Sequence, residues 1–292
     1  MGTFVKGSRR TPYAFLMFYG APGIGKTPMA AYWAKELSTM GDGQGRVLYI
    51  DLDFSLTSVP KEVWGDFITF HPDMKENGAI IKPYMQMTTE VLPKLMKGEY
   101  DVCVLDGITA LGAAVLDDVK SIAYTPAGKD GGKKDARLSI PMGAGEKEWG
   151  IPSQTDYRAA QGQIAEIVGA LRRCPCHVII NAHEKMAQYK EPNGEKEVKG
   201  GPWFVGAEPT FSLPAWFDAC YYLRYIDKTV GGGQWRKERA LCTTQPPNVG
   251  TNYVVKDRIG GLCDVEPNPD ALTLFNKVRP RFEALIKSAK ED

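Results

Sequence analysis

The stretch Gly20-Ala21-Pro22-Gly23-Ile24-Gly25-Lys26-Thr27 fits the pattern G-x-x-x-x-G-K-[S/T], in which a glycine-rich turn leads into a lysine and a hydroxyl residue. Glycines permit a tight loop whose backbone N–H groups converge on phosphate oxygens, at the positive end of the following helix. Lys26 is placed to reach the outer phosphates, and the Thr27 hydroxyl to ligate Mg²⁺. The stretch therefore predicts a nucleoside triphosphate site made by residues 20–28 and including Pro28.

The segments on either side of this loop support that interpretation. An apolar run, Ala14–Tyr19, precedes the loop and is typical of a buried strand. An amphipathic segment, Pro28–Met40, follows it and predicts a helix, with Pro28 tolerated in the first turn. A glycine-rich surface turn with an exposed lysine is the alternative, and it does not require this strand–loop–helix context.

The rest of the chain alternates short apolar runs with longer amphipathic ones, which predicts an α/β fold with a mainly parallel, twisted sheet flanked by helices. Further strands are expected at 46–51, 66–70, 102–105 and 177–180, followed by C-terminal antiparallel strands at 219–225, 234–243 and 251–256. Further helices are expected at 78–97, 108–119, 156–173 and 270–290. Residues 121–155 and 184–214 are expected to be long irregular loops, because they lack clear periodicity. We expect a single domain over residues 1–292, with its core at about 13–260.

Charge and hydropathy exclude several classes of protein. Lys and Arg number 36 against 35 Asp and Glu, a formal net charge of +1, which excludes a polybasic protein held to DNA or membrane by bulk charge. No apolar run approaches the ~20 residues that a membrane-spanning helix requires. The six cysteines are sparse and lie mostly in apolar runs. We expect a cytoplasmic protein with no membrane partner.

Carboxylates follow two of the expected strands. Asp106 comes directly after the apolar run Val102–Leu105, where a metal-anchoring carboxylate would accompany the triphosphate site. The alternative role of Asp106 is to cap the next helix, and the two roles are compatible. Asp51 and Asp53 follow the second strand, and alternation directs them to the same side. One of them is a candidate to orient the attacking water, whereas the alternative is an acidic pair that caps a loop.

His183 follows another buried strand, in Asn181-Ala182-His183-Glu184. This position makes it a candidate sensor of the γ-phosphate. A histidine that merely caps a turn is equally compatible with the pattern, because a single histidine is weak evidence.

In this order, the motifs resemble those of the RecA-like ATPases, and in particular the small phage-encoded RecA-like proteins that act in single-strand annealing recombination. The resemblance spans about residues 15–260. Beyond the phosphate loop and His183 it rests on Leu48-Tyr49-Ile50 with its acidic pair, Val104-Leu105-Asp106, Leu213-Pro214-Ala215-Trp216-Phe217-Asp218 leading into Tyr221-Tyr222-Leu223, and Val255-Lys256-Asp257-Arg258-Ile259-Gly260. It implies a RecA-like P-loop core, Mg²⁺-dependent ATP hydrolysis and, if the protein is phage-encoded, the host cytoplasm.

The segment Lys256-Asp257-Arg258-Ile259-Gly260 is similar to the K-x-R-x-G element of RadA-type and DnaB-type relatives. In those families the two cations reach the nucleotide of the neighbouring subunit, which implies a homo-oligomer, either ring or filament. Lys256 and Arg258 alternate on one strand edge, and two cations aimed at a γ-phosphate stabilise phosphoryl transfer. An exposed edge strand carrying Lys and Arg against aggregation is the alternative.

Two residues depart from the family pattern. By the resemblance, Asp53 stands where the catalytic carboxylate is usually a Glu, one methylene longer. Gly107 follows Asp106 where a Ser is common. Both departures predict slow hydrolysis more than weak nucleotide binding.

The loops expected at 121–155 and 184–214 correspond to the segments that hold single-stranded DNA in RecA-like proteins. Both contain lysines and aromatic residues, which suit phosphate contact and base stacking. Acidic residues offset these lysines, so charge alone is equally consistent with a solvated loop. The resemblance favours single-stranded DNA as a partner, with a single-strand-binding protein as a further partner class.

Three other functions remain open from the sequence. The same fold serves ring helicases and loader motors. A small-molecule kinase would carry an arginine-rich lid, whereas the arginines here cluster late, on expected strands. A nucleotide-gated structural protein with little hydrolysis is compatible with Asp53 and Gly107.

Overall fold

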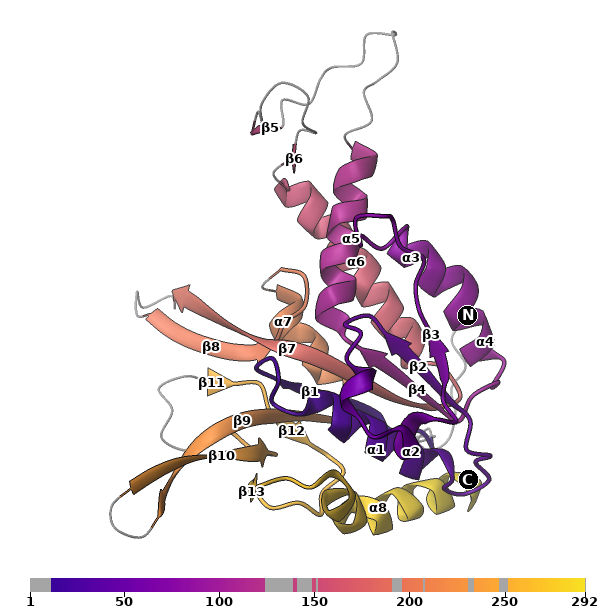
Figure 1. Ribbon diagram of the computed structural model, residues 1–292, viewed down its shortest axis with the longest axis vertical. Helices are drawn as coiled ribbons and strands as arrows, with labels where there is room; N and C mark the ends of the chain where they lie inside the picture. Colours follow the sequence, from indigo (N-terminus) through magenta and orange to yellow (C-terminus); the bar gives the residue numbers. More distant parts are fainter. Residues whose placement is uncertain are drawn as a thin grey trace, which may run out of the picture.

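The computed structural model describes residues 12–123, 139–140, 149–150, 152–190, 196–206, 208–230, 234–246 and 252–291. Helices cover both faces of a large twisted sheet, and two hairpins extend from one end of it (Figure 1). The expected α/β class is therefore confirmed. None of the described helices combines the length and apolar character needed to cross a membrane.

The sheet has 11 strands in the described residues, and its main path runs β3-β2-β4-β7-β1-β9-β10-β13. The six strands from β3 to β9 are parallel, whereas β10 and β13 are antiparallel to their neighbours. These strands are β1 (Phe15–Gly20), β2 (Val47–Asp51), β3 (Ile68–Phe70), β4 (Val102–Asp106), β7 (His177–Lys190), β9 (Ala219–Val230), β10 (Gln234–Cys242) and β13 (Val265–Pro267). The sheet also contains β8 (Lys196–Pro202), β11 (Asn252–Tyr253) and β12 (Lys256–Asp257), whereas β5 (Ser139–Ile140) and β6 (Trp149–Gly150) pair with each other in a separate two-stranded sheet.

Two layers of helices sandwich the sheet, as the continuous apolar runs of the parallel strands require. One layer contains α1 (Lys26–Ser38) and α8 (Ala271–Glu291), with η1 (Leu56–Ser58) and α2 (Lys61–Trp64) beside them. The other contains α3 (Pro83–Gln86), η2 (Met87–Val91), α4 (Leu92–Met96), α5 (Ile108–Ala123) and α6 (Gln154–Leu171). Two short elements, α7 (Glu208–Ser212) and η3 (Leu213–Trp216), lead into β9.

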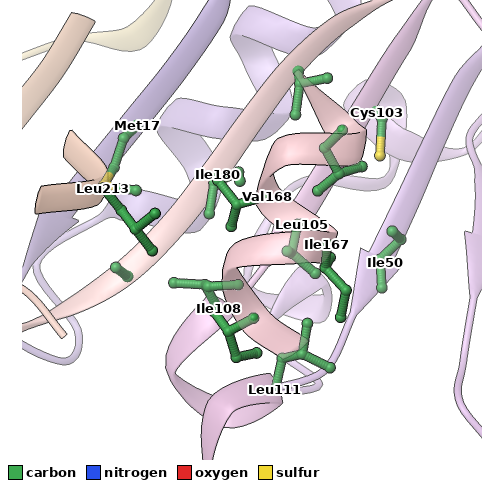
Figure 2. Close-up of a cluster of buried hydrophobic side chains, with 14 of the residues drawn as sticks. Met17, Ile50, Cys103, Leu105, Ile108, Leu111, Ile167, Val168, Ile180 and Leu213 are labelled. Atoms are coloured by element: carbon green, nitrogen blue, oxygen red, sulfur yellow. The ribbon is translucent and has the colours of Figure 1, made fainter. Parts of the chain in front are cut away.

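Alternation along the strands divides the apolar side chains between the two layers. Leu16 and Phe18 face α1 and α8, where fully buried Trp33 packs on Phe275 and donates its indole N–H to the Ala271 carbonyl. Met17 points the other way, into the cluster that the sheet forms with α5 and α6 (Figure 2). Burial on both faces holds the carboxyl ends of the strands rigidly, and these ends carry the polar residues of interest.

Most of the described residues in the range 184–214, which was expected to be a long irregular loop, instead form regular structure. Strand β7 continues to Lys190 and pairs antiparallel with β8, and α7 and η3 follow. The hairpin extends beyond the helix layers, so its strands lack the apolar alternation that marks a half-buried strand in sequence (Figure 1). Most of the other expected loop, 121–155, lies outside the described residues.

Two smaller expectations also differ from the structure. The helical region expected at 78–97 begins only at Pro83, whose missing N–H costs no hydrogen bond in the first turn of a helix. The strand expected at 251–256 is divided into β11, which pairs with β8, and β12, which pairs with the start of β9. Arg258 therefore lies just after the two-residue strand that holds Lys256.

Candidate functional site

The phosphate loop connects β1 to α1 at the carboxyl end of β1. Gly25 occupies the N-cap of α1 with φ +103°, a conformation that strongly favours glycine. No side-chain hydrogen bond caps α1, and its first turn holds no acidic residue. The positive end of α1 is therefore open to an anion such as a phosphate group.

The Lys26 ammonium folds back along the loop, where it donates to the carbonyl oxygens of Gly20 and Ala21 at 3.1 and 2.9 Å. Burial lowers the pKa of Lys26, and the charges of Asp106 and Asp53 oppose this shift. Both carboxylates thus favour a cation at this point, as a phosphate-binding lysine requires.

Asp106 is buried and connected to the loop through a serine. Its Oδ2 accepts hydrogen bonds from the Tyr49 hydroxyl at 2.6 Å and from the Ser55 hydroxyl at 3.1 Å. Ser55 Oγ lies 3.0 Å from Thr27 Oγ1. The hydroxyl of Thr27 and the carboxylate of Asp106, the two expected metal ligands, therefore contact the same third group.

Asp51 fixes this serine rather than facing a reactant. Its carboxylate accepts hydrogen bonds from the backbone N–H groups of Ser55 and Leu56, at 3.0 and 3.3 Å. Burial raises the pKa of Asp51, and these two hydrogen bonds oppose the shift. Of the acidic pair, Asp51 is therefore the loop-capping residue.

Asp53 lies beside His183, with Oδ2 3.9 Å from Nε2 of the histidine. Both side chains are partly exposed, at 31% and 30%. Burial raises the pKa of Asp53, with nearby Asp106 adding to the shift. Burial also lowers the pKa of His183, and Lys26 adds to that shift. The strand register explains why His183 lies near the phosphate loop, because His183 pairs with Gly20, where that loop begins.

Gly107 provides the space that the Asp53 carboxylate occupies. A Cβ at Gly107 would lie 2.7 Å from Asp53 Oδ2 and 3.4 Å from the Asn181 carbonyl oxygen. A side chain at position 107 would therefore displace the Asp53 carboxylate from the position it occupies here.

Unpartnered polar atoms gather beside these carboxylates. The buried side chain of Asn181, which pairs in register with Asp106, has no hydrogen-bond partner among the described residues for either its amide nitrogen or its oxygen. Nδ1 of His183 is also buried and without a partner. Because buried polar groups normally find partners, these atoms fit a site that takes a polar ligand.

The residues present fit a nucleotide with Mg²⁺. The open end of α1 and Lys26 would hold the phosphates, and Thr27 with Asp106 would hold the metal. When bound, Mg²⁺ supplies charge neutralisation at the phosphates. Among the described residues, no backbone or side-chain hydrogen bond occupies the carboxylate of Asp53, which would be free to orient or deprotonate a water.

A family model described as an AAA domain matches residues 13–258 of the chain. The chain belongs to this AAA domain family. It is a P-loop ATPase domain, and the match covers the phosphate loop together with Asp53, Asp106 and His183. Among curated proteins, none matches this sequence.

The AAA domain keeps Lys256 and Arg258 away from its own phosphate loop. Strand β12 pairs with Ala219 and Cys220 at the start of β9, whereas Gly20 pairs with Leu223 further along. Lys256 Nζ donates to the Ala215 carbonyl oxygen at 2.8 Å and also to that of Phe217. Arg258 is exposed. The two cations thus differ, with Lys256 bonded within its own chain and Arg258 facing solvent.

Three residues of the site were missed by sequence reasoning. Ser55 lies in an irregular segment, and Tyr49 and Asn181 lie inside strands where they read as ordinary core positions. The sequence contained a weak indication of Asn181, because its polar amide ends an apolar run two residues before His183, the expected sensor of the γ-phosphate. The sequence contained no such indication of Ser55 or Tyr49, because their contacts with Asp106 join segments that are far apart in the chain.

Substituting Gly107 by alanine is expected to lower the rate of ATP hydrolysis by roughly 10- to 100-fold, while nucleotide affinity stays near that of the wild type. The added methyl must displace the Asp53 carboxylate, which it would approach at 2.7 Å. Gly162→Ala is the matched control, because a Cβ there meets nothing within 4 Å in helix α6. Steady-state kinetics and nucleotide titration measure the two quantities. Equal rates for the two variants would contradict the packing argument.

Proposed function

We propose that this AAA domain binds and hydrolyses ATP with Mg²⁺ as part of a homo-oligomer, and acts on single-stranded DNA in recombination or annealing. Subunits associate head-to-tail, so that Arg258 of one subunit approaches the nucleotide of the next. Its exposure and its distance along β9 from its own phosphate loop support this role. Lys256, bonded to the Ala215 carbonyl, would have to exchange that contact on assembly.

One observation carries the DNA part of the proposal, namely a short hydrogen-bonded connection between the nucleotide site and an aromatic cavity. The backbone N–H of His183 donates to Thr109 Oγ1 at 3.0 Å, and this hydroxyl donates to the Trp203 carbonyl at 2.9 Å. The Trp203 N–H in turn donates to the His183 carbonyl at 2.6 Å. A shift of His183 towards a nucleotide would therefore move the backbone of Trp203.

The cavity next to this connection has the chemistry to hold a base and a phosphate. Its volume is about 490 Å³, and its lining includes Tyr157, Lys185 and Trp203. Trp203 is 43% exposed and Tyr157 38%. The Lys185 ammonium lies 5.5 Å from the Trp203 ring centroid. Exposed rings beside a cation suit sequence-tolerant binding of single strands.

The test is ATP hydrolysis over a titration of protein, with and without single-stranded DNA, at low and moderate salt. Specific activity is expected to rise with protein concentration, because each site would be completed by a neighbouring subunit. Single strands are expected to stimulate hydrolysis, and salt to weaken the stimulation, because phosphate contacts release counterions. Trp203→Ala is expected to remove the stimulation.

Met186→Ala is the matched control, because Met186 is 59% exposed on the same hairpin next to Lys185 but faces away from the cavity. It should retain the stimulation by DNA. A rate strictly proportional to protein concentration and indifferent to DNA would contradict the proposal. Directional unwinding of duplexes would instead identify a ring helicase.

A further inference from the structure

The hairpin of β9 and β10 extends beyond the end of β1, alongside the phosphate loop. The last residue of β1, Gly20, pairs with Leu223, but β9 continues to Val230 with β10 as its partner (Figure 1). This part of the hairpin is thus level with, and beyond, the loop that receives the phosphates. It contributed no residue to the site described above.

One face of the hairpin is continuous with the layer that contains α1. Tyr221, Leu223 and Leu241 belong to the apolar cluster of α1 and α8. Because side chains alternate along a strand, Tyr225 and Arg239 lie on that same face, and they pair directly across the hairpin. Helix α1 begins only at Lys26 and does not cover them, so Tyr225 is 48% exposed.

The Arg239 guanidinium approaches the phosphate loop itself. Its Nη1 lies 2.8 Å from the position that a Cβ on Gly25 would occupy, so the missing side chain of Gly25 permits the contact. Arg239 is exposed, and within the described part of the chain it forms no ion pair with a carboxylate. An unpaired guanidinium at the N-cap of α1 is well placed for a phosphate oxygen.

Strand order indicates which end of a nucleotide would face the hairpin. Asp53 follows β2, Asp106 ends β4, and His183 lies in β7 at the point where β1 ends, and all three strands are on one side of β1. Strands β9 and β10 lie on the other side of β1. A triphosphate whose reacting end faces the carboxylates therefore directs its nucleoside end towards β9 and β10.

We propose that Tyr225 and Arg239 form a nucleoside subsite within the same subunit. Arg239 binds the phosphate nearest the nucleoside, and the Tyr225 ring stacks on the base. This inference rests on the nucleotide binding in the proposed function and adds a further phosphate contact, from Arg239, and a ring, Tyr225, that distinguishes a nucleoside triphosphate from inorganic triphosphate. Neither residue takes part in hydrolysis.

The test compares the affinity of the full chain for ATP and for inorganic tripolyphosphate, each with Mg²⁺, by isothermal titration calorimetry. Tyr225→Leu is expected to weaken ATP binding by roughly 10-fold and to leave tripolyphosphate unchanged, because only ATP has a base to stack. Arg239→Gln is expected to weaken both ligands by about 10-fold, because both present a phosphate to the guanidinium.

Two substitutions on the same hairpin serve as controls. Trp235→Leu removes an aromatic ring that is 72% exposed on the same face, four residues beyond Arg239. Arg236→Gln removes an arginine from the opposite face. Neither is expected to change either affinity.

The outcomes separate this subsite from the proposed function. Equal ATP affinity for wild type and Tyr225→Leu, or an equal loss for both ligands in that variant, would overturn the stacking role. Unchanged affinities in Arg239→Gln would overturn the phosphate contact. If wild type binds neither ligand, nucleotide binding itself fails, and with it the subsite.

Discussion

Lys26→Ala is expected to lower ATP hydrolysis by on the order of 100-fold or more and to remove detectable nucleotide binding at concentrations that saturate the wild type. Lys26 is the cation inside the phosphate loop, where it donates to the Gly20 and Ala21 carbonyls. Asp106 and Asp53 favour its charged form. Without the Lys26 ammonium, the outer phosphates lie near the carboxylates of Asp53 and Asp106 and lack the positive charge that the lysine supplied. Nucleotide titration and hydrolysis assays measure the two effects.

Lys35→Ala is the matched control for this variant. Lys35 belongs to the same helix but donates to the Glu62 carbonyl on the surface. It should bind and hydrolyse ATP as the wild type does. Retained nucleotide affinity in Lys26→Ala would show that the loop is not the phosphate site.

Asp53→Asn is expected to lower the turnover rate by about 10²- to 10⁴-fold, the usual contribution of a general base. Nucleotide affinity should be unchanged or slightly higher, because a negative charge near the phosphates is removed. The substitution preserves the volume of the side chain beside Gly107 and His183. Single-turnover hydrolysis with saturating ATP separates this loss from any effect on binding.

Asp66→Asn provides the control, since Asp66 is an exposed carboxylate next to the short helix α2. It should leave turnover unchanged. Full turnover in Asp53→Asn would transfer the role of water activation to another group, for which His183, 3.9 Å from the Asp53 carboxylate, is a candidate.

The sequence was sufficient for the local parts of the site. The phosphate loop could be predicted from its sequence motif, because its conformation depends on residues that are adjacent in the chain. The apolar runs predicted the parallel strands, and polar residues that follow them mark the carboxyl edge of the sheet, where Asp53, Asp106 and His183 lie. These predictions needed only periodicity and strand ends.

The hairpins were harder to predict for a physical reason. Sequence periodicity reports burial, and β7–β8 lies largely outside the helix layers, so its outer strands show no apolar alternation. The C-terminal strands β9 and β10 were recognised because β9 begins in the core and β10 ends there, with Tyr221 and Leu241 fully buried. Periodicity therefore located a strand only where one of its faces was buried.

The phosphate loop, the parallel sheet and the carboxylates at the ends of its strands could all be predicted from local sequence patterns. The contacts between these groups became evident from the tertiary structure. It assigned Asp51 to the loop and Asp53 to His183, joined Thr27 to Asp106 through Ser55, and brought Arg239 to Gly25. The reason is that such contacts follow from strand order and register, which join residues far apart in the chain and leave no mark on the local pattern.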